Sequence, residues 1–115
     1  MGLPILFRLD IPVWTTPFDG ASMDGSPELK FTMPHLGAPL HFNLQLDTAD
    51  TFATGDLRDI SSDLDQTGWD YWNGSAWTAV PGTGVPASFG GNEARHTVQT
   101  PLTATTWYRR VRAGT

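Results

Sequence analysis

The middle of the chain alternates strictly between apolar and polar residues, with apolar side chains at Leu40, Phe42, Leu44 and Leu46. A period of two places successive side chains on opposite faces of a β-strand, so this segment predicts a strand with one buried face. Similar alternation, or short runs of β-favouring residues, predicts further strands at 5–13, 29–33, 57–61, 95–98 and 105–113. Segments rich in Gly, Pro and Asp predict loops at 14–27, 81–92 and around the short strand within 47–68.

Residues 69–80 predict a β-hairpin, because two aromatic-rich runs flank an Asn-Gly dipeptide. Asn-Gly is the dipeptide best suited to a two-residue type I′ turn. With that turn, Trp72 pairs with Ser75 and Asp70 pairs with Trp77. Trp72 and Trp77 are then diagonal neighbours on one face of the hairpin.

Aromatic residues occupy both faces of this hairpin, since Trp69 and Tyr71 share the face opposite Trp72 and Trp77. One face of a half-buried sheet packs on the core, and the other meets solvent or a partner. We expect Trp69 and Tyr71 to lie in the core and Trp72 and Trp77 to lie at an interface.

Short strands separated by frequent turn signals are typical of an all-β fold. The six or seven predicted strands favour an antiparallel β-sandwich, and 115 residues fit a single domain with its own core. We expect residues 1–25 to form an N-terminal strand or arm followed by a loop, and residues 26–115 to form the sandwich.

Three segments, residues 26–31, 42–47 and 102–113, resemble strands of fibronectin type III and immunoglobulin-like sandwiches. The hairpin at 69–77, with the Pro/Gly loop after it, is similar to modules of bacteriophage virion proteins such as decoration, tail and fibre-associated proteins. The resemblance implies a fibronectin III/Ig-like fold. It also implies a non-catalytic structural role in the virion, after synthesis in the host cytoplasm. The implied partners are other virion proteins, of the capsid or tail, and copies of the chain itself.

The resemblance further implies one more strand beside residues 105–113, and a sheet edge without it has unpaired main-chain groups. The strand predicted at 5–13 is patterned to fill this place, within its own chain or on a neighbouring subunit. Deletion of residues 1–13 is therefore expected to abolish assembly while leaving much of the β structure. The expected partner-binding residues are Ile5, Phe7, Leu9, Ile11, Trp72 and Trp77.

Charges are distributed unevenly along the chain, whose net charge is −5. Between residues 47 and 70 there are seven aspartates and one arginine, whereas from residue 95 onward there are four arginines and no acid. Alternation in the last strand places one of these, Arg109, on the inward face with Val111. An acidic chain lacks the basic surface that nucleic-acid binding requires. We expect no signal peptide and no membrane span, since no basic region precedes an apolar run and no long apolar segment occurs.

Candidate metal chemistry is confined to the aspartates. Residues 63–68 match the opening of an EF-hand calcium loop, but Gly74 stands where that loop has its bidentate Glu. An irregular calcium site therefore stays open beside the alternative of solvated loop carboxylates, and its candidate ligands are Asp47, Asp50, Asp63 and Asp65.

No motif points to catalysis. The three histidines, His35, His41 and His96, lack the spacing of a metal site or a general base, and the chain has no cysteine. The serines lack the context of a nucleophile elbow. We predict that the protein is not an enzyme and that it holds no cofactor and no metal.

The outward tryptophans allow a second function, a carbohydrate- or receptor-binding module. Trp72 and Trp77 would stack on sugar rings, while Asp70 and Asn73 would supply polar contacts. A third alternative, an adaptor domain within a cellular complex, differs from the virion protein only in its partner.

Overall fold

Ten strands and no helix lie in the part of the chain that the computed structural model describes, which comprises residues 13–16, 22–32, 39–86 and 93–114. The strands are β1 (Val13–Thr16), β2 (Ser22–Gly25), β3 (Glu28–Thr32), β4 (His41–Asp47), β5 (Arg58–Ser61), β6 (Trp69–Trp72), β7 (Trp77–Ala79), β8 (Glu93–Thr97), β9 (Leu102–Thr106) and β10 (Tyr108–Gly114).

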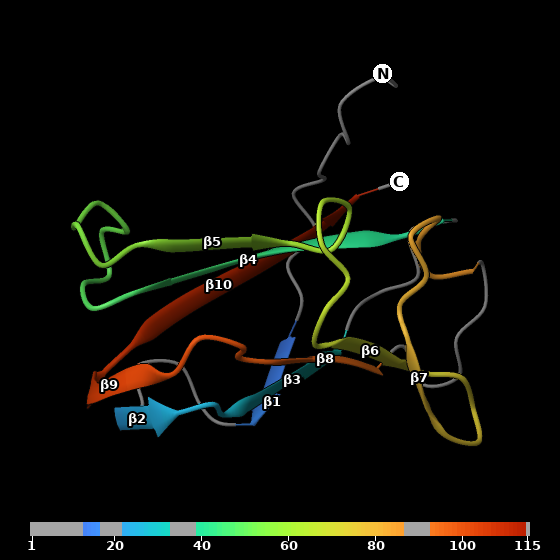
Figure 1. Ribbon diagram of the computed structural model, residues 1–115, viewed down its shortest axis with the longest axis horizontal. Helices are drawn as coiled ribbons and strands as arrows, with labels where there is room; N and C mark the ends of the chain where they lie inside the picture. Colours follow the sequence, from blue (N-terminus) through green and yellow to red (C-terminus); the bar gives the residue numbers. More distant parts are fainter. Residues whose placement is uncertain (1–12, 17–21, 33–38, 87–92, 115) are drawn as a thin grey trace.

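The strands form two packed layers, and all pairings between these described strands are antiparallel (Figure 1). One layer is a five-stranded sheet in the order β1-β3-β8-β6-β7, and the other is a three-stranded sheet in the order β10-β4-β5. A small third sheet pairs β2 with β9 at one end. The predicted all-β, antiparallel sandwich is confirmed.

An aromatic cluster joins the two layers at the centre of the core. Phe31 on β3 meets Phe42 on β4 edge to face, with 5.2 Å between ring centroids. Trp69 on β6 stacks on Phe42 at 5.7 Å and contacts the His96 ring at 4.6 Å. All four side chains are essentially inaccessible to solvent, so residues from both sheets share one hydrophobic core.

The strand predicted from the clearest alternation is β4, whose Phe42, Leu44 and Leu46 are fully buried. Pairing of Leu46 with Arg109 and of Leu44 with Val111 places β10 beside it in register. Arg109 is buried, as its inward alternation predicts, and its Nη1 lies 3.9 Å from the sulfur of Met23 on β2.

Two predictions about strand boundaries are wrong. The segment expected to be a loop, residues 14–27, contains β2 and most of β1. The described residues alone hold ten strands, whereas six or seven were expected for the chain. The final strand, expected over 105–113, is interrupted at Trp107 and divided between β9 and β10. The Trp107 indole turns into the protein, where its Nε1 donates to the Thr103 carbonyl at 2.9 Å, so the chain bends at this residue.

The hairpin forms, but its predicted register is wrong. Trp72 pairs directly with Trp77 rather than with Ser75, and four residues form the loop. Asn73 explains the difference, because its Oδ1 accepts hydrogen bonds from the amides of Ser75 and Ala76, at 2.8 and 2.9 Å. This side-chain cap stabilises a longer loop than the two-residue turn.

Candidate functional site

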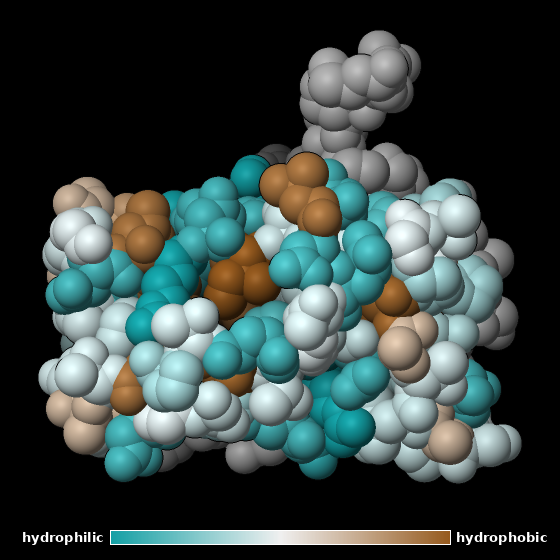
Figure 2. Space-filling model, in the orientation of Figure 1, coloured by the Kyte–Doolittle hydropathy of each residue, from teal (hydrophilic) through white to brown (hydrophobic). Residues whose placement is uncertain are grey.

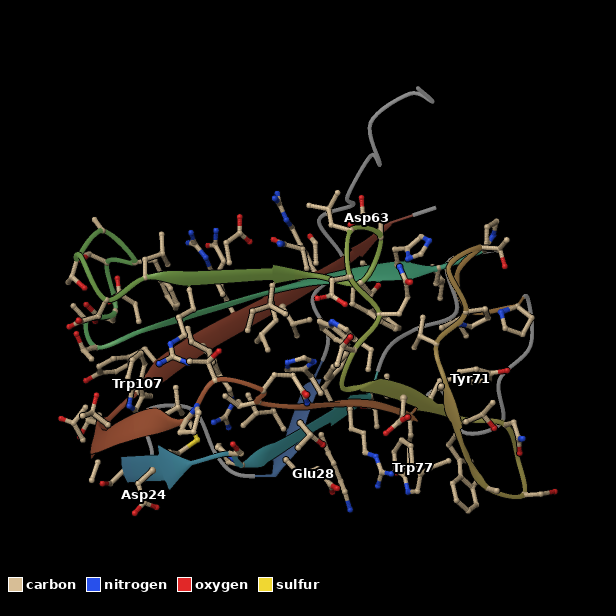
Figure 3. The ribbon with its side chains drawn as sticks, in the orientation of Figure 1. Asp24, Glu28, Asp63, Tyr71, Trp77 and Trp107 are labelled. Carbon is tan, nitrogen blue, oxygen red and sulfur yellow. The ribbon has the colours of Figure 1, made fainter. Side chains whose placement is uncertain are left out.

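The outward side of the five-stranded sheet carries a cluster of aromatic and charged side chains, which we call the aromatic face. Trp77 and Glu28 project from this sheet on the side away from the three-stranded sheet (Figure 3). The strands β3, β8, β6 and β7 lie side by side and contribute its members, which are Glu28, Lys30, Asp70, Trp72, Trp77 and Arg95.

Trp72 and Trp77 lie directly opposite each other at the end of the β6–β7 hairpin. Their ring centroids are 5.6 Å apart with an interplanar angle of 70°, an edge-to-face arrangement. Both side chains are half-buried, whereas Trp69 and Tyr71, on the same strand as Trp72, are buried in the core. The predicted division of these four residues between the core and an outer surface is confirmed.

Arg95 connects the charged and aromatic parts of this face. Its Nε donates to Asp70 Oδ2 at 3.0 Å, and its Nη1 donates to Glu28 Oε2 at 3.2 Å. The same guanidinium lies over the Trp77 ring, 4.2 Å from the centroid. The Lys30 ammonium is 3.2 Å from Glu28 and 5.8 Å from the Trp77 centroid. The Arg95 guanidinium therefore packs on the Trp77 ring, and the Lys30 ammonium lies at the outer limit of a cation–π contact with it.

Of the residues predicted to bind a glycan, the structure brings Trp72, Trp77 and Asp70 onto one face. Asp70 accepts from Arg95, and Asn73 is engaged in the hairpin loop, where its Nδ2 donates to Thr78 Oγ1 at 2.8 Å. Sequence reasoning missed Arg95. Its position between the inward Ala94 and His96 indicates that it faces outward. Its acidic partner, however, depends on the register of β8 against β6, which the sequence does not show.

The predicted partner-binding residues of the N-terminal strand, Ile5, Phe7, Leu9 and Ile11, lie outside the described residues. The described part of that segment begins at Val13, which pairs with Thr32 of β3.

The aspartates considered for calcium do not converge, and within the described ranges no three His, Asp or Glu residues are grouped to hold a metal ion. Asp47 is buried and accepts hydrogen bonds from the Thr54 hydroxyl and from the amides of Thr48 and Thr54. Burial opposes ionisation of this carboxyl, but these hydrogen bonds outweigh it and lower its pKa. Asp47 therefore organises the loop after β4.

The two histidines of the described region are both buried. His41 Nδ1 lies 3.1 Å from Ser62 Oγ, and burial lowers its pKa. Burial lowers the pKa of His96 further, to about 4, although the charges of Asp65 and Asp70 act in the opposite direction. Both imidazoles are neutral at pH 7 and belong to the core.

Comparisons with models of protein families, with curated proteins and with solved structures give no match for this chain. A search of the described residues gives no helix with the length and apolar character that crossing a membrane requires.

Proposed function

We propose that the chain is a non-catalytic structural protein of a virion, a capsid decoration or tail-associated module that docks through its aromatic face. The observation that carries the proposal is the pair of half-buried tryptophans, 5.6 Å apart, beside a guanidinium already fixed on the Trp77 ring. Tryptophan and arginine are enriched among the residues that dominate binding energy at protein interfaces, and a tryptophan ring offers a large contact area with few rotatable bonds.

The rigidity of the aromatic face supports this function. The face sits on four hydrogen-bonded strands over a packed core, and Arg95 holds its position through three contacts. A surface ordered before docking loses little conformational entropy when the partner binds. The resemblance of the hairpin to virion modules supplies the class of partner, a capsid or tail protein.

The proposal is tested in virus particles produced from the genome that encodes the chain. Purified particles would be probed for the chain by quantitative mass spectrometry, with wild type compared with the double variant Trp72→Ala/Trp77→Ala. We expect the chain to copurify with particles, and the double variant to be depleted at least about tenfold, as loss of a hot spot predicts.

Thr105→Ala is the matched control, because Thr105 is exposed on β9, outside the aromatic face. It should enter particles like wild type. A chain absent from particles, or a double variant incorporated as well as the control, would contradict the proposal.

The carbohydrate-binding alternative uses the same tryptophans with different partners. Two of its predicted polar residues are already engaged, Asp70 by Arg95 and Asn73 by the hairpin loop, which favours the protein interface. A glycan array separates the two functions. Saturable binding to one glycan, lost in Trp72→Ala with the fold intact, would favour the carbohydrate-binding module.

The N-terminal segment is tested separately by light scattering. A variant that lacks residues 1–12 keeps all of β1, so the described sandwich stays complete. If the segment exchanges between copies, the full chain is an oligomer and the truncated chain is a monomer. The same mass for both would remove strand exchange from the proposal.

A further inference from the structure

A groove of about 560 Å³ opens on the side of the sandwich where the two layers meet, away from the aromatic face. We call it the β5 groove. Figure 2 shows apolar side chains reaching the surface along this side of the molecule, surrounded by polar ones. Its walls are the strand β5, the loop after it and the segment that continues β8, and its apolar side chains are Ile60, Leu64 and Val98.

One wall of the β5 groove is an open strand edge. The Ser62 amide donates to the Phe42 carbonyl at 2.9 Å, so Phe42 directs its main-chain groups toward β5. Since these groups alternate in direction along an antiparallel pair, Ile60 and Arg58 face β4, and Asp59 faces away from it. Within the described ranges, the main-chain N–H and C=O of Asp59 have no hydrogen-bond partner. These two groups line the groove as one hydrogen-bond donor and one acceptor, which a further strand could pair with.

The floor of the groove holds a second polar group without a partner. His96 is 1 % exposed, and its Nδ1 makes no hydrogen bond to any described residue. The ring lines the groove from below, against Trp69. A buried polar atom that lacks a partner is costly, so a ligand group that reaches His96 would recover this loss.

The charge of the groove favours a cationic side chain. Asp59 and Asp65 both line it, and Asp65 lies close enough to His96 to raise its pKa against the effect of burial. The lining also includes Arg58, which donates to the carbonyls of Thr100 and Pro101 and lies over the Trp107 ring. This guanidinium is held at the end of the groove, and among the described residues neither aspartate forms an ion pair. Asp59 Oδ1 accepts a hydrogen bond from Asn43 Nδ2 at 2.6 Å, so Asp65 is the carboxylate that a cationic side chain would meet.

We propose that the β5 groove binds an extended peptide of a basic partner protein, which adds a strand to β5 and inserts an arginine or lysine beside Asp65 and His96. The peptide residue opposite Asp59 exchanges both main-chain hydrogen bonds with it. The next peptide residue points inward, beside Ile60, so its aliphatic stem covers Ile60 and Val98 while its charged end reaches Asp65. This site does not depend on the aromatic face and goes beyond the function proposed above.

The test is an NMR titration of the full chain with the acetylated, amidated peptide Thr-Val-Thr-Arg-Thr-Val-Thr. A second peptide carries citrulline in place of arginine, which keeps the shape and removes the charge. We expect saturable shifts of the Asp59 amide and of the His96 imidazole nitrogens, with binding at least about tenfold weaker for the citrulline peptide.

Two pairs of variants separate main-chain pairing from charge. Asp59→Pro removes the outward N–H without disturbing the bonds to β4 and should abolish binding, whereas Asp59→Asn keeps that N–H and should bind. Asp65→Asn keeps the acceptor for the Thr67 amide and should weaken binding of the arginine peptide about tenfold. Asp50→Asn removes a charge from an exposed loop position outside the groove and should bind like wild type.

Thermal unfolding of each variant would show that the fold is intact. Equal binding of the two peptides, or wild-type binding by a folded Asp59→Pro variant, would overturn the proposal. Shifts of the Asp59 amide that depend on protein concentration without peptide would also overturn it, because a second copy would then be the occupant. Trp72→Ala should bind the peptide normally, so failure of the aromatic face would not be confused with failure of this groove.

Discussion

The two faces of the five-stranded sheet carry similar aromatic side chains in opposite surroundings. On the inner face, Trp69 packs between Phe42 and His96 and is 1 % exposed. On the outer face, Trp77 keeps contact with solvent and is held by Arg95 and Trp72. The inner face draws its stability from burial, and the outer face from charges that water screens. Substitutions on the inner face should therefore change folding, and those on the outer face should change binding.

The largest effect is expected from Trp69→Ala, because the indole fills the centre of the core and its removal leaves a cavity there. The variant should lose about 3–5 kcal/mol of unfolding free energy, the usual range for a buried aromatic residue. Urea unfolding followed by circular dichroism measures this loss. A loss below about 1 kcal/mol would mean that the inner face is not the main source of stability.

The second effect is a pH dependence of the unfolding free energy, which comes from His96 on the inner face. Burial lowers the pKa of His96 to about 4 from an ordinary value of 6.5, so the unfolded chain binds this proton more readily. The stabilisation is complete above pH 6.5 and is lost as the pH falls toward 4, by about 3 kcal/mol in total.

Unfolding free energies between pH 7.5 and pH 4 would measure this dependence, with His96→Gln as the control. The control variant should show a smaller slope, because of the two described histidines it retains only His41, whose pKa is also lowered. The same slope in both proteins would contradict the role of His96.

A smaller effect is expected on the outer face. Trp77→Ala removes the ring that Arg95 covers but leaves both ion pairs of that guanidinium in place. Its cost should be about 2 kcal/mol or less, since a partly exposed cation–π contact contributes about 0.5–1 kcal/mol and the edge-to-face contact with Trp72 about as much. Thermal unfolding measures the cost. A loss comparable to that of Trp69→Ala would show that the aromatic face belongs to the core.

The smallest effect is expected for Lys30→Ala. The ion pair of Lys30 with Glu28 joins two side chains that are each more than one-third exposed. Exposed pairs contribute little, so unfolding free energy should change by less than about 0.5 kcal/mol. The measurement is the same urea titration, repeated at high salt. A larger change that disappears at high salt would show that the charges on this face act as one network.

The faces of the hairpin were predictable although its register was not. The predicted pairing of Trp72 with Ser75 differs from the observed pairing with Trp77 by two residues. A shift of two leaves every side chain on its original face, because the period of a strand is two. The hydrophobic pattern therefore placed Trp69 and Tyr71 inward, while the hydrogen bonds of Asn73 decided the loop length.

The strand β2 could not be predicted in the same way. Its sequence, Ser-Met-Asp-Gly, has a single buried side chain, Met23, and little preference for β structure. It is a strand because Met23 pairs with Thr105 of β9, far away in the sequence. The β5 groove has the same origin, since the sequence does not show that Asp59 and His96 line one space.

The order of the strands has a consequence for how the chain folds as it is synthesised. The strand β4 pairs with β10, more than sixty residues later, and β3 pairs with β8 over a similar distance. The β6–β7 hairpin is a local pairing that needs no distant partner. Distant strands pair only after the chain between them has closed into a long loop, and this closure costs conformational entropy. A topology with several such pairings therefore folds slowly. Until β10 is synthesised, the edge of β4 that pairs with it has unpaired main-chain groups, and such an open strand edge favours aggregation of the nascent chain.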